Sequence, residues 1–271
     1  MSYAISQGRL SAAVYTLGCK LNQLESESIA HAFREEGFDL TPWKDGKTPD
    51  NSKWNDNSIL IINTCTVTSK SEQKARRLIR KALRDCPGTV VIVTGCYAQM
   101  EAESLESLSA NTKRLFVIPG ERKNRILELP RLLASEGIAS SNTTLHDLTA
   151  LLGSWAAGED CPAGDSSFCF KPLDFSFHSR AFLKIQDGCD NNCSFCRVNL
   201  ARGKSRSIKP GEALATLRSL EERGYEEAVL TGVNISLYAG IVEDREPLDL
   251  AGLLEYLLSG TGRIRLRLSS I

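Results

Sequence analysis

The stretch Gly188-Cys189-Asp190-Asn191-Asn192-Cys193-Ser194-Phe195-Cys196 places three thiols within eight residues, at the spacing CxxxCxxC. It follows the short apolar run 181–185 and precedes a basic segment. Three cysteines cannot close the four-ligand shell of a structural metal site. A four-iron cluster held by only three thiolates instead keeps one iron open to a further ligand, where chemistry can take place. The spacing therefore favours an iron-sulfur cluster in this loop.

A structural zinc site is the alternative interpretation of the same loop. Such sites are usually closed by four Cys or His ligands, typically supplied as two pairs. The nearest candidate for a fourth ligand is His178, which lies on the other side of the predicted strand 181–185. Zinc and unliganded cysteines remain alternatives, and the iron-sulfur cluster is the favoured interpretation.

The length and composition indicate a globular protein of two domains. The chain has 271 residues, of which 42% are hydrophobic and 24% are charged. We predict one domain over residues 1–139, a linker rich in small and polar residues over 140–179 that contains a short helix around 146–152, and a second domain over 180–271. The formal net charge is zero, so a site for RNA has to be a local patch.

The nine cysteines are not arranged like those of a small secreted disulfide scaffold. The first ten residues lack the pattern of a signal peptide, and no apolar run approaches the length that spans a membrane. We therefore expect a cytoplasmic protein with no membrane partner and with reduced thiols, a setting that favours metal ligation over disulfides.

The first half alternates apolar strands with helices. Strands are predicted over 12–17, 58–63, 89–94 and 115–118. Helices are predicted to begin at a cap at Asn22 or Ser26, at Ser69 or Ser71, at Glu101 and at Arg125. Continuous apolar strands of this kind form a parallel sheet that helices cover on both faces. The residues between Thr41 and Ser58 are predicted to form a loop insertion.

One cysteine follows each of the first three predicted strands: Cys19, Cys65 and Cys96. Ligands of parallel sheets bind beyond the carboxyl ends of the strands, so these thiols are predicted to share one metal site. Free cysteine is also common as a small buried hydrophobe, and one such residue would carry no meaning. The presence of a cysteine after each of the three strands favours the shared metal site. Cys86, before Pro87 and Gly88, is interpreted as structural or exposed.

The second half contains three strand–helix units, with strands over 181–185, 227–230 and 264–269 and helices over 209–223 and 248–258. The basic segment 197–207 either faces phosphates or the cluster, or is a solvated loop. Gly232 either lets a ligand approach the backbone or forms a turn. A parallel sheet that ends on strand 264–269 has an open edge, so we expect the chain to be part of a longer fold.

Four motifs carry a resemblance to a known family. They are Thr16–Gln23 (TLGCKLNQ), Asn63–Thr68 (NTCTVT), Thr94–Gln99 (TGCYAQ), and Gly188–Cys196 with Leu200–Gly203 (LARG). Together they resemble the radical S-adenosylmethionine (SAM) methylthiotransferases, and the form GCKLNQ looks most like the MtaB branch. The resemblance implies the first part of a radical-SAM partial (β/α) barrel after the N-terminal domain. The later strands and the small RNA-binding domain of the family are missing from these residues.

The resemblance also implies an activity and its cofactors. Cys189, Cys193 and Cys196 would hold a [4Fe-4S] cluster that binds SAM. The triad Cys19, Cys65 and Cys96 would hold an auxiliary [4Fe-4S] cluster that delivers sulfur. Phe195 and Gly232 would lie near the SAM. The substrate would be N6-threonylcarbamoyladenosine at position 37 of ANN-decoding tRNA, converted to its 2-methylthio derivative with the help of a reducing electron-transfer protein and a sulfur donor.

Two other functions remain open at this point. One is the same chemistry on a ribosomal protein side chain, as in the related RimO branch. The other is a non-catalytic, cysteine-rich metal-binding scaffold. Iron content and SAM cleavage separate the scaffold from the two enzymes, and nucleoside analysis of tRNA separates the two enzymes from each other.

Overall fold

The structure is a computed structural model that describes residues 10–41, 43, 58–66, 68–109, 112–138, 140, 143–158, 166–175, 180–242 and 246–269. The chain divides into two compact units. Unit 1 consists of residues 1–18 and 32–162, and unit 2 of residues 19–31 and 163–271. Most of the predicted insertion 41–58, Cys161 and His178 lie outside the described residues.

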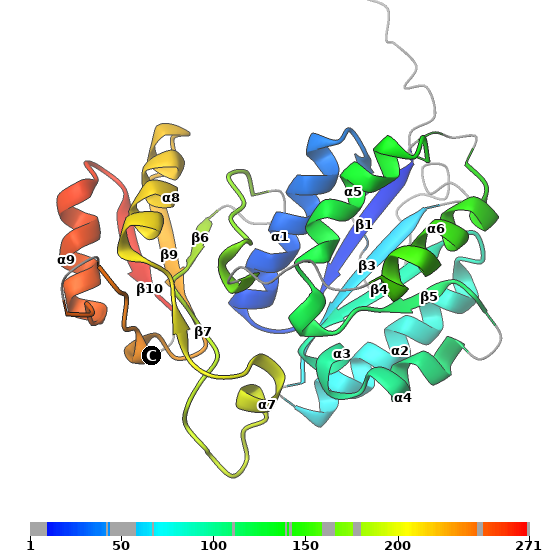
Figure 1. Cartoon of the computed structure of the whole chain (residues 1–271), viewed down its shortest axis with the longest axis horizontal. Coiled ribbons are helices and arrows are strands. Elements are labelled where there is room, and N and C mark those ends of the chain that lie inside the picture. The colour runs from blue at the N-terminus through cyan, green and yellow to red at the C-terminus, as the bar shows by residue number, and fades with distance from the viewer. Residues whose placement is uncertain are drawn as a thin grey trace, which may run out of the picture. The chain divides into compact units, whose positions relative to one another are not determined.

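Unit 1 contains a five-stranded parallel sheet with the order β2-β1-β3-β4-β5 (Figure 1). Its strands are β1 (Ser11–Thr16), β2 (Asp39–Leu40), β3 (Ile59–Thr64), β4 (Val90–Gly95) and β5 (Leu115–Val117). The four predicted strands are thus confirmed to within one or two residues, and the short β2 is additional. The order places the carboxyl ends of β1, β3 and β4 side by side.

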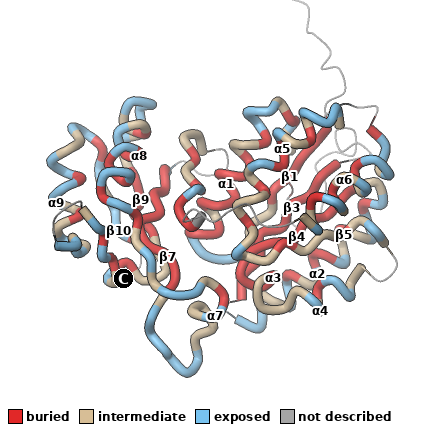
Figure 2. Tube along the Cα trace, in the orientation of Figure 1, coloured by how far each residue is buried: buried red, intermediate tan, exposed pale blue. Residues whose placement is uncertain are grey.

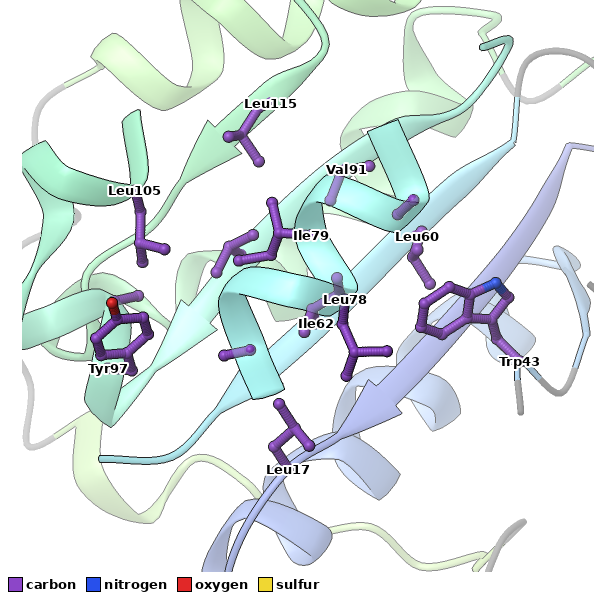
Figure 3. Packing of buried hydrophobic residues seen from close by; sticks show 14 of the residues in the cluster. Leu17, Trp43, Leu60, Ile62, Leu78, Ile79, Val91, Tyr97, Leu105 and Leu115 are labelled. Carbon is purple, nitrogen blue, oxygen red and sulfur yellow. The ribbon is translucent and has the colours of Figure 1, made fainter. Parts of the chain in front are cut away.

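Helices cover both faces of this sheet, as predicted. Those of unit 1 are α2 (Ser69–Asp85), α3 (Cys96–Met100), α4 (Ala102–Glu106), α5 (Arg125–Ser135) and α6 (Leu145–Ala157), with 3-10 turns at Ser107–Ser109 and Gly120–Arg122. Helix α1 (Lys20–Glu35) crosses the boundary between the units. Leu78 and Ile79 of α2 pack against Leu60 and Ile62 of β3 (Figure 3). Burial of such aliphatic side chains contributes about 1.5–3 kcal/mol each.

Two helix starts differ from their prediction. The first helix begins at Lys20, so Asn22 and Ser26 lie inside it and are fully buried, and neither caps it. Polar residues are normally placed at caps because they compete for backbone hydrogen bonds, but tertiary partners keep these two inside the helix. The helix predicted from Glu101 is preceded by α3, whose first residue is Cys96 itself.

The linker begins later than its predicted start at residue 140. Thr144 and Asp147 form a capping box that starts α6. Leu148 and Leu152 of this helix are fully buried, and Arg125 lies 5.4 Å from the ring centre of Trp155. This apolar stripe makes α6 part of unit 1, and the division between the units falls after residue 162.

Unit 2 contains a three-stranded parallel sheet with the order β10-β9-β6 and a separate antiparallel pair, β7 with β8. The elements are β6 (Ala181–Lys184), β7 (Gln186–Asp187), α7 (Val198–Arg202), β8 (Arg206–Ser207), α8 (Pro210–Glu222), β9 (Glu227–Thr231), α9 (Leu250–Gly260) and β10 (Arg265–Leu268), with 3-10 turns at Ser166–Phe168 and Ile235–Leu237. The three predicted strands and two predicted helices are confirmed. A helix as long and apolar as a membrane span requires is not found among the described residues.

Candidate functional site

The loop with three cysteines leaves unit 2 directly after β7. Cys193 and Phe195 are exposed, whereas Cys189 and Cys196 are half-buried. Most of the loop that precedes α7 is exposed (Figure 2). The N–H of Cys196 donates to the carbonyl of Cys193 at 3.0 Å, which folds the CxxC end into a turn. Phe195 is 88% exposed, so its ring is presented at the surface of the loop.

The base of this loop is tightly closed. The N–H of Cys189 donates to the carbonyl of Gly203 at 3.1 Å, and Ser205 N–H donates to a carboxylate oxygen of Asp190 at 3.0 Å. Gly188 has φ +71°, and a Cβ there would lie 1.9 Å from the carbonyl oxygen of Lys204. Only glycine fits this position. The basic segment therefore closes the base of the cysteine loop with its own backbone.

The side chain of Gln186 joins two loops at this base. Its Oε1 accepts from the backbone N–H groups of Val233 and Asn234, at 3.0 and 2.9 Å. Its Nε2 donates to the carbonyl of Gly188 at 2.7 Å and to the Ser205 hydroxyl at 3.0 Å. The residue is fully buried. Gln186 thus connects the loop after β9 with the first residue of the cysteine loop.

The packing explains why residue 232 is a glycine. A Cβ on Gly232 would lie 2.8 Å from Cγ2 of Ile235 and 2.9 Å from Oε1 of Gln186. The space around Gly232 is filled by the chain's own side chains, so the close approach required here is that of Gln186. A contact of Gly232 with SAM stays a prediction.

Gln186→Leu is expected to destabilise unit 2 by about 1–3 kcal/mol, because two partly buried backbone N–H groups lose their acceptor. Hydrogen exchange measures the effect at Val233 and Asn234, whose amides should lose protection. The matched variant Gln186→Glu keeps the acceptor oxygen, so these two amides should stay protected in it. Equal exchange in both variants would contradict this role of Gln186.

A buried cluster of charges lies beside the loop, within unit 2. The guanidinium of Arg202 is 3.0 Å from Glu25 and 3.1 Å from Asp187. Lys184 also pairs with Asp187 and lies 4.0 Å from Glu25. All four side chains are at most 8% exposed. Arg202 belongs to the predicted basic segment, and its charge is neutralised inside the fold, which neither interpretation of that segment anticipated.

This charge cluster reaches the cysteine that follows β1. Arg202 Nη2 donates to Oδ1 of Asn22 at 2.8 Å. The thiol of Cys19 lies 3.8 Å from the same oxygen. Residues 19–31 belong to unit 2. The segment after the cysteine loop is therefore joined, through one amide, to the turn that carries Cys19.

Cys65 and Cys96 lie together at the sheet edge of unit 1. Their preceding residues, Thr64 and Gly95, are partners in the register of β3 and β4, so the two cysteines leave adjacent strands at the same level. Both are buried. The hydroxyl of Thr64 donates to the carbonyl of Thr94 at 2.5 Å, which holds these two strand ends together.

The described thiols are free, but they are not gathered into a ready metal site. None of the eight described cysteines forms a disulfide. Within the described part of the chain, no three Cys, His, Asp or Glu side chains come close enough to hold a metal ion. The donors fit an iron-sulfur cluster in kind, since thiolates are its ligands. The two predicted triads remain predictions, and Cys86, buried at the end of α2, is apart from both.

Comparison with known proteins gives this arrangement a family. Residues 11–117, which contain Cys19, Cys65 and Cys96, match the model of the uncharacterized protein family UPF0004. Residues 183–270, which contain the cysteine loop, match the Radical SAM superfamily model. The second segment is a radical SAM domain.

Relatives align along nearly the whole chain. A threonylcarbamoyladenosine tRNA methylthiotransferase MtaB from Treponema pallidum is 36% identical over 96% of this chain and 60% of its own length. The MtaB of Bacillus subtilis is 31% identical over 94% of this chain and 50% of its own. The chain thus spans about half the length of these relatives. The radical SAM methyltransferase TsrM from Kitasatospora setae, with TM-score 0.50 and 14% identity, covers 93% of this chain and shares the fold.

The sequence patterns indicate the candidate cysteines, but they do not indicate the residues that hold the cysteine-bearing loops in place. Glu25 and Arg202 are 177 positions apart, so no local pattern connects them. Gln186 lies between an apolar strand and the loop, where a single polar residue gives no signal of its own. One hint was present in the sequence. Glu25 lies on the same side of the first helix as the apolar residues Leu21 and Ile29, so its carboxylate requires a buried partner.

Proposed function

We propose that this chain is the methylthiotransferase part of an enzyme that converts N6-threonylcarbamoyladenosine-37 of tRNA to its 2-methylthio derivative. The observation that carries the proposal is the similarity to MtaB proteins over at least 94% of the chain, in which all six candidate cysteines lie within the two matched segments.

In this proposal the loop thiols Cys189, Cys193 and Cys196 would hold a [4Fe-4S] cluster with one iron left for SAM. When bound, the cluster and SAM supply the one-electron chemistry that removes a non-acidic hydrogen atom, such as the one on adenosine C2. The residues of unit 2 fix the loop: Gln186 ties its first residue to the loop after β9, and Arg202 anchors the segment that follows it.

The second triad would hold the sulfur-bearing cluster. Cys65 and Cys96 leave adjacent strands of unit 1, and Cys19 is the residue after Gly18, where that unit's first segment ends. The second cluster, the electron donor and the sulfur donor are parts of the proposal. They are supported by the three cysteines that follow three neighbouring strands.

Nucleoside analysis of tRNA tests this function. Deletion of the gene is expected to remove 2-methylthio-N6-threonylcarbamoyladenosine and to leave the unmethylthiolated nucleoside in its place. The matched comparison is the deletion strain that carries the full gene with Cys193→Ala, which should not restore the modified nucleoside, while the wild-type gene should. An unchanged nucleoside profile after deletion would sink the proposal.

A further inference from the structure

Helix α2 of unit 1 is strongly basic in an otherwise neutral chain. Its 17 residues carry seven cations and two acids, whereas the 33 basic and 33 acidic residues of the whole chain cancel. The cations are Lys70, Lys74, Arg76, Arg77, Arg80, Lys81 and Arg84. Such a concentration produces a local positive potential that the net charge conceals.

Part of this charge lines an open groove of about 630 Å³. It is lined by Tyr15 of β1, by Leu78 and by five cations. The cations are Lys74, Arg77, Arg80, Lys81 and Arg84. Since Lys74 and Arg84 are ten positions apart, the cations follow the helix for about 15 Å. The groove therefore presents an array of charges along one helix, with one aromatic side chain in its lining.

Three of the seven cations are explained by the fold. Lys81 and Arg84 pair with Asp85 at 2.9 and 2.7 Å, and these pairs lower the pKa of the Asp85 carboxyl to about 2. Both also lie near the helix C-terminus, where the helix dipole favours positive charge. Arg76 lies over the ring of Tyr97 at 5.7 Å. The presence of these three positive charges is therefore explained without a bound ligand.

The cations in the middle of the helix lack such an explanation. Lys74, Arg77 and Arg80 are exposed and have no acidic partner among the described residues. They follow one another at i, i+3 spacing, where like charges are neighbours on the helix surface and destabilise the helix. Their arrangement works against helix stability, which points to a role in binding.

We infer that the groove along α2 binds the phosphate backbone of RNA, through Lys74, Arg77 and Arg80. Arginine and lysine are the usual phosphate contacts, and the aromatic side chain in the lining suits a base or ribose. A small anion fits less well, because the charges run along a line and do not converge on one point. This inference rests on the proposed function, and it names the surface of unit 1 that tRNA would contact.

The test is binding of an unmodified tRNA transcript to the full 271-residue chain over a series of salt concentrations. The double variant Arg77→Gln/Arg80→Gln is expected to bind about tenfold more weakly, and its logarithmic salt slope should fall by about 1–2. The control Lys113→Gln/Arg131→Gln removes the same charge from exposed positions outside α2. It should retain the wild-type affinity and slope within a factor of about two.

Three results would overturn the inference: no binding of tRNA by the wild-type chain, equal losses in both double variants, or no loss in the α2 variant. Circular dichroism and thermal melting check that both double variants fold. The outcome is separable from the proposed function. If the chain binds tRNA along α2 but deletion leaves the nucleosides unchanged, only the proposed methylthiotransferase function is refuted. If the nucleoside is lost on deletion and the α2 variant binds tRNA normally, only the inference about the groove is refuted.

Discussion

A chain with Cys193 replaced by alanine is expected to lose SAM cleavage completely and to retain about half of the iron of the wild-type protein after anaerobic reconstitution. Two four-iron clusters correspond to about eight irons per chain, and three thiolates are the minimum that the loop offers to one of them. Removing Cys193 leaves Cys189 and Cys196, which cannot hold the cluster. Iron analysis and detection of 5′-deoxyadenosine measure the two effects.

A matched pair of variants makes this prediction sharper. Cys65→Ala should also lose about half of the iron while it keeps SAM cleavage, because the loop of unit 2 stays intact. Cys86→Ala is the control, since Cys86 is buried at the end of α2 and apart from both triads. It should keep all of the iron. Zinc without iron in the wild-type protein, or full iron in the Cys193 variant, would contradict the two-cluster proposal.

The alternation of strands and helices could be predicted because each element has its own short pattern of apolar residues. The four predicted strands of the first sheet are rich in apolar residues, as in Ile59–Thr64, whereas the two-residue β2 gives no such pattern. The helix α6 was misplaced in a linker because Ser, Gly and Ala dominate the residues around it. Its buried Leu148, Leu152 and Trp155 show that a short apolar stripe outweighs the composition of its flanks.

The residues that support the site could not be predicted, because they act through partners far away in the chain. The residues around Asn22 predict that it caps a helix, but its Oδ1 accepts a hydrogen bond from Arg202, 180 positions away. Gly232 reads as a turn or a ligand contact, but its lack of a side chain makes room for Gln186. In both cases a polar group is buried only because a long-range hydrogen bond satisfies it.

The charge cluster of unit 2 gives the second large effect. Arg202→Met is expected to lower the free energy of unfolding by about 3–5 kcal/mol, because it removes the guanidinium that lies 3.0 Å from the buried Glu25 carboxylate, whereas Lys184 lies 4.0 Å away. The measurement is urea denaturation of the full chain. Lys204→Met is the matched control: it removes an exposed cation two positions along, and it should change the stability by less than about 0.5 kcal/mol.

A second mutation separates the loss of a partner from simple loss of packing. If the cost of Arg202→Met comes from an uncompensated carboxylate, then Glu25→Gln in the same chain should recover part of it, and the two changes should couple by about 0.5–3 kcal/mol. If the cost comes from the missing aliphatic stem, the two changes should add. Additive behaviour would therefore refute the charge network, and coupling would mean that Glu25 and Arg202 hold the turn with Cys19 against the segment that closes the cysteine loop.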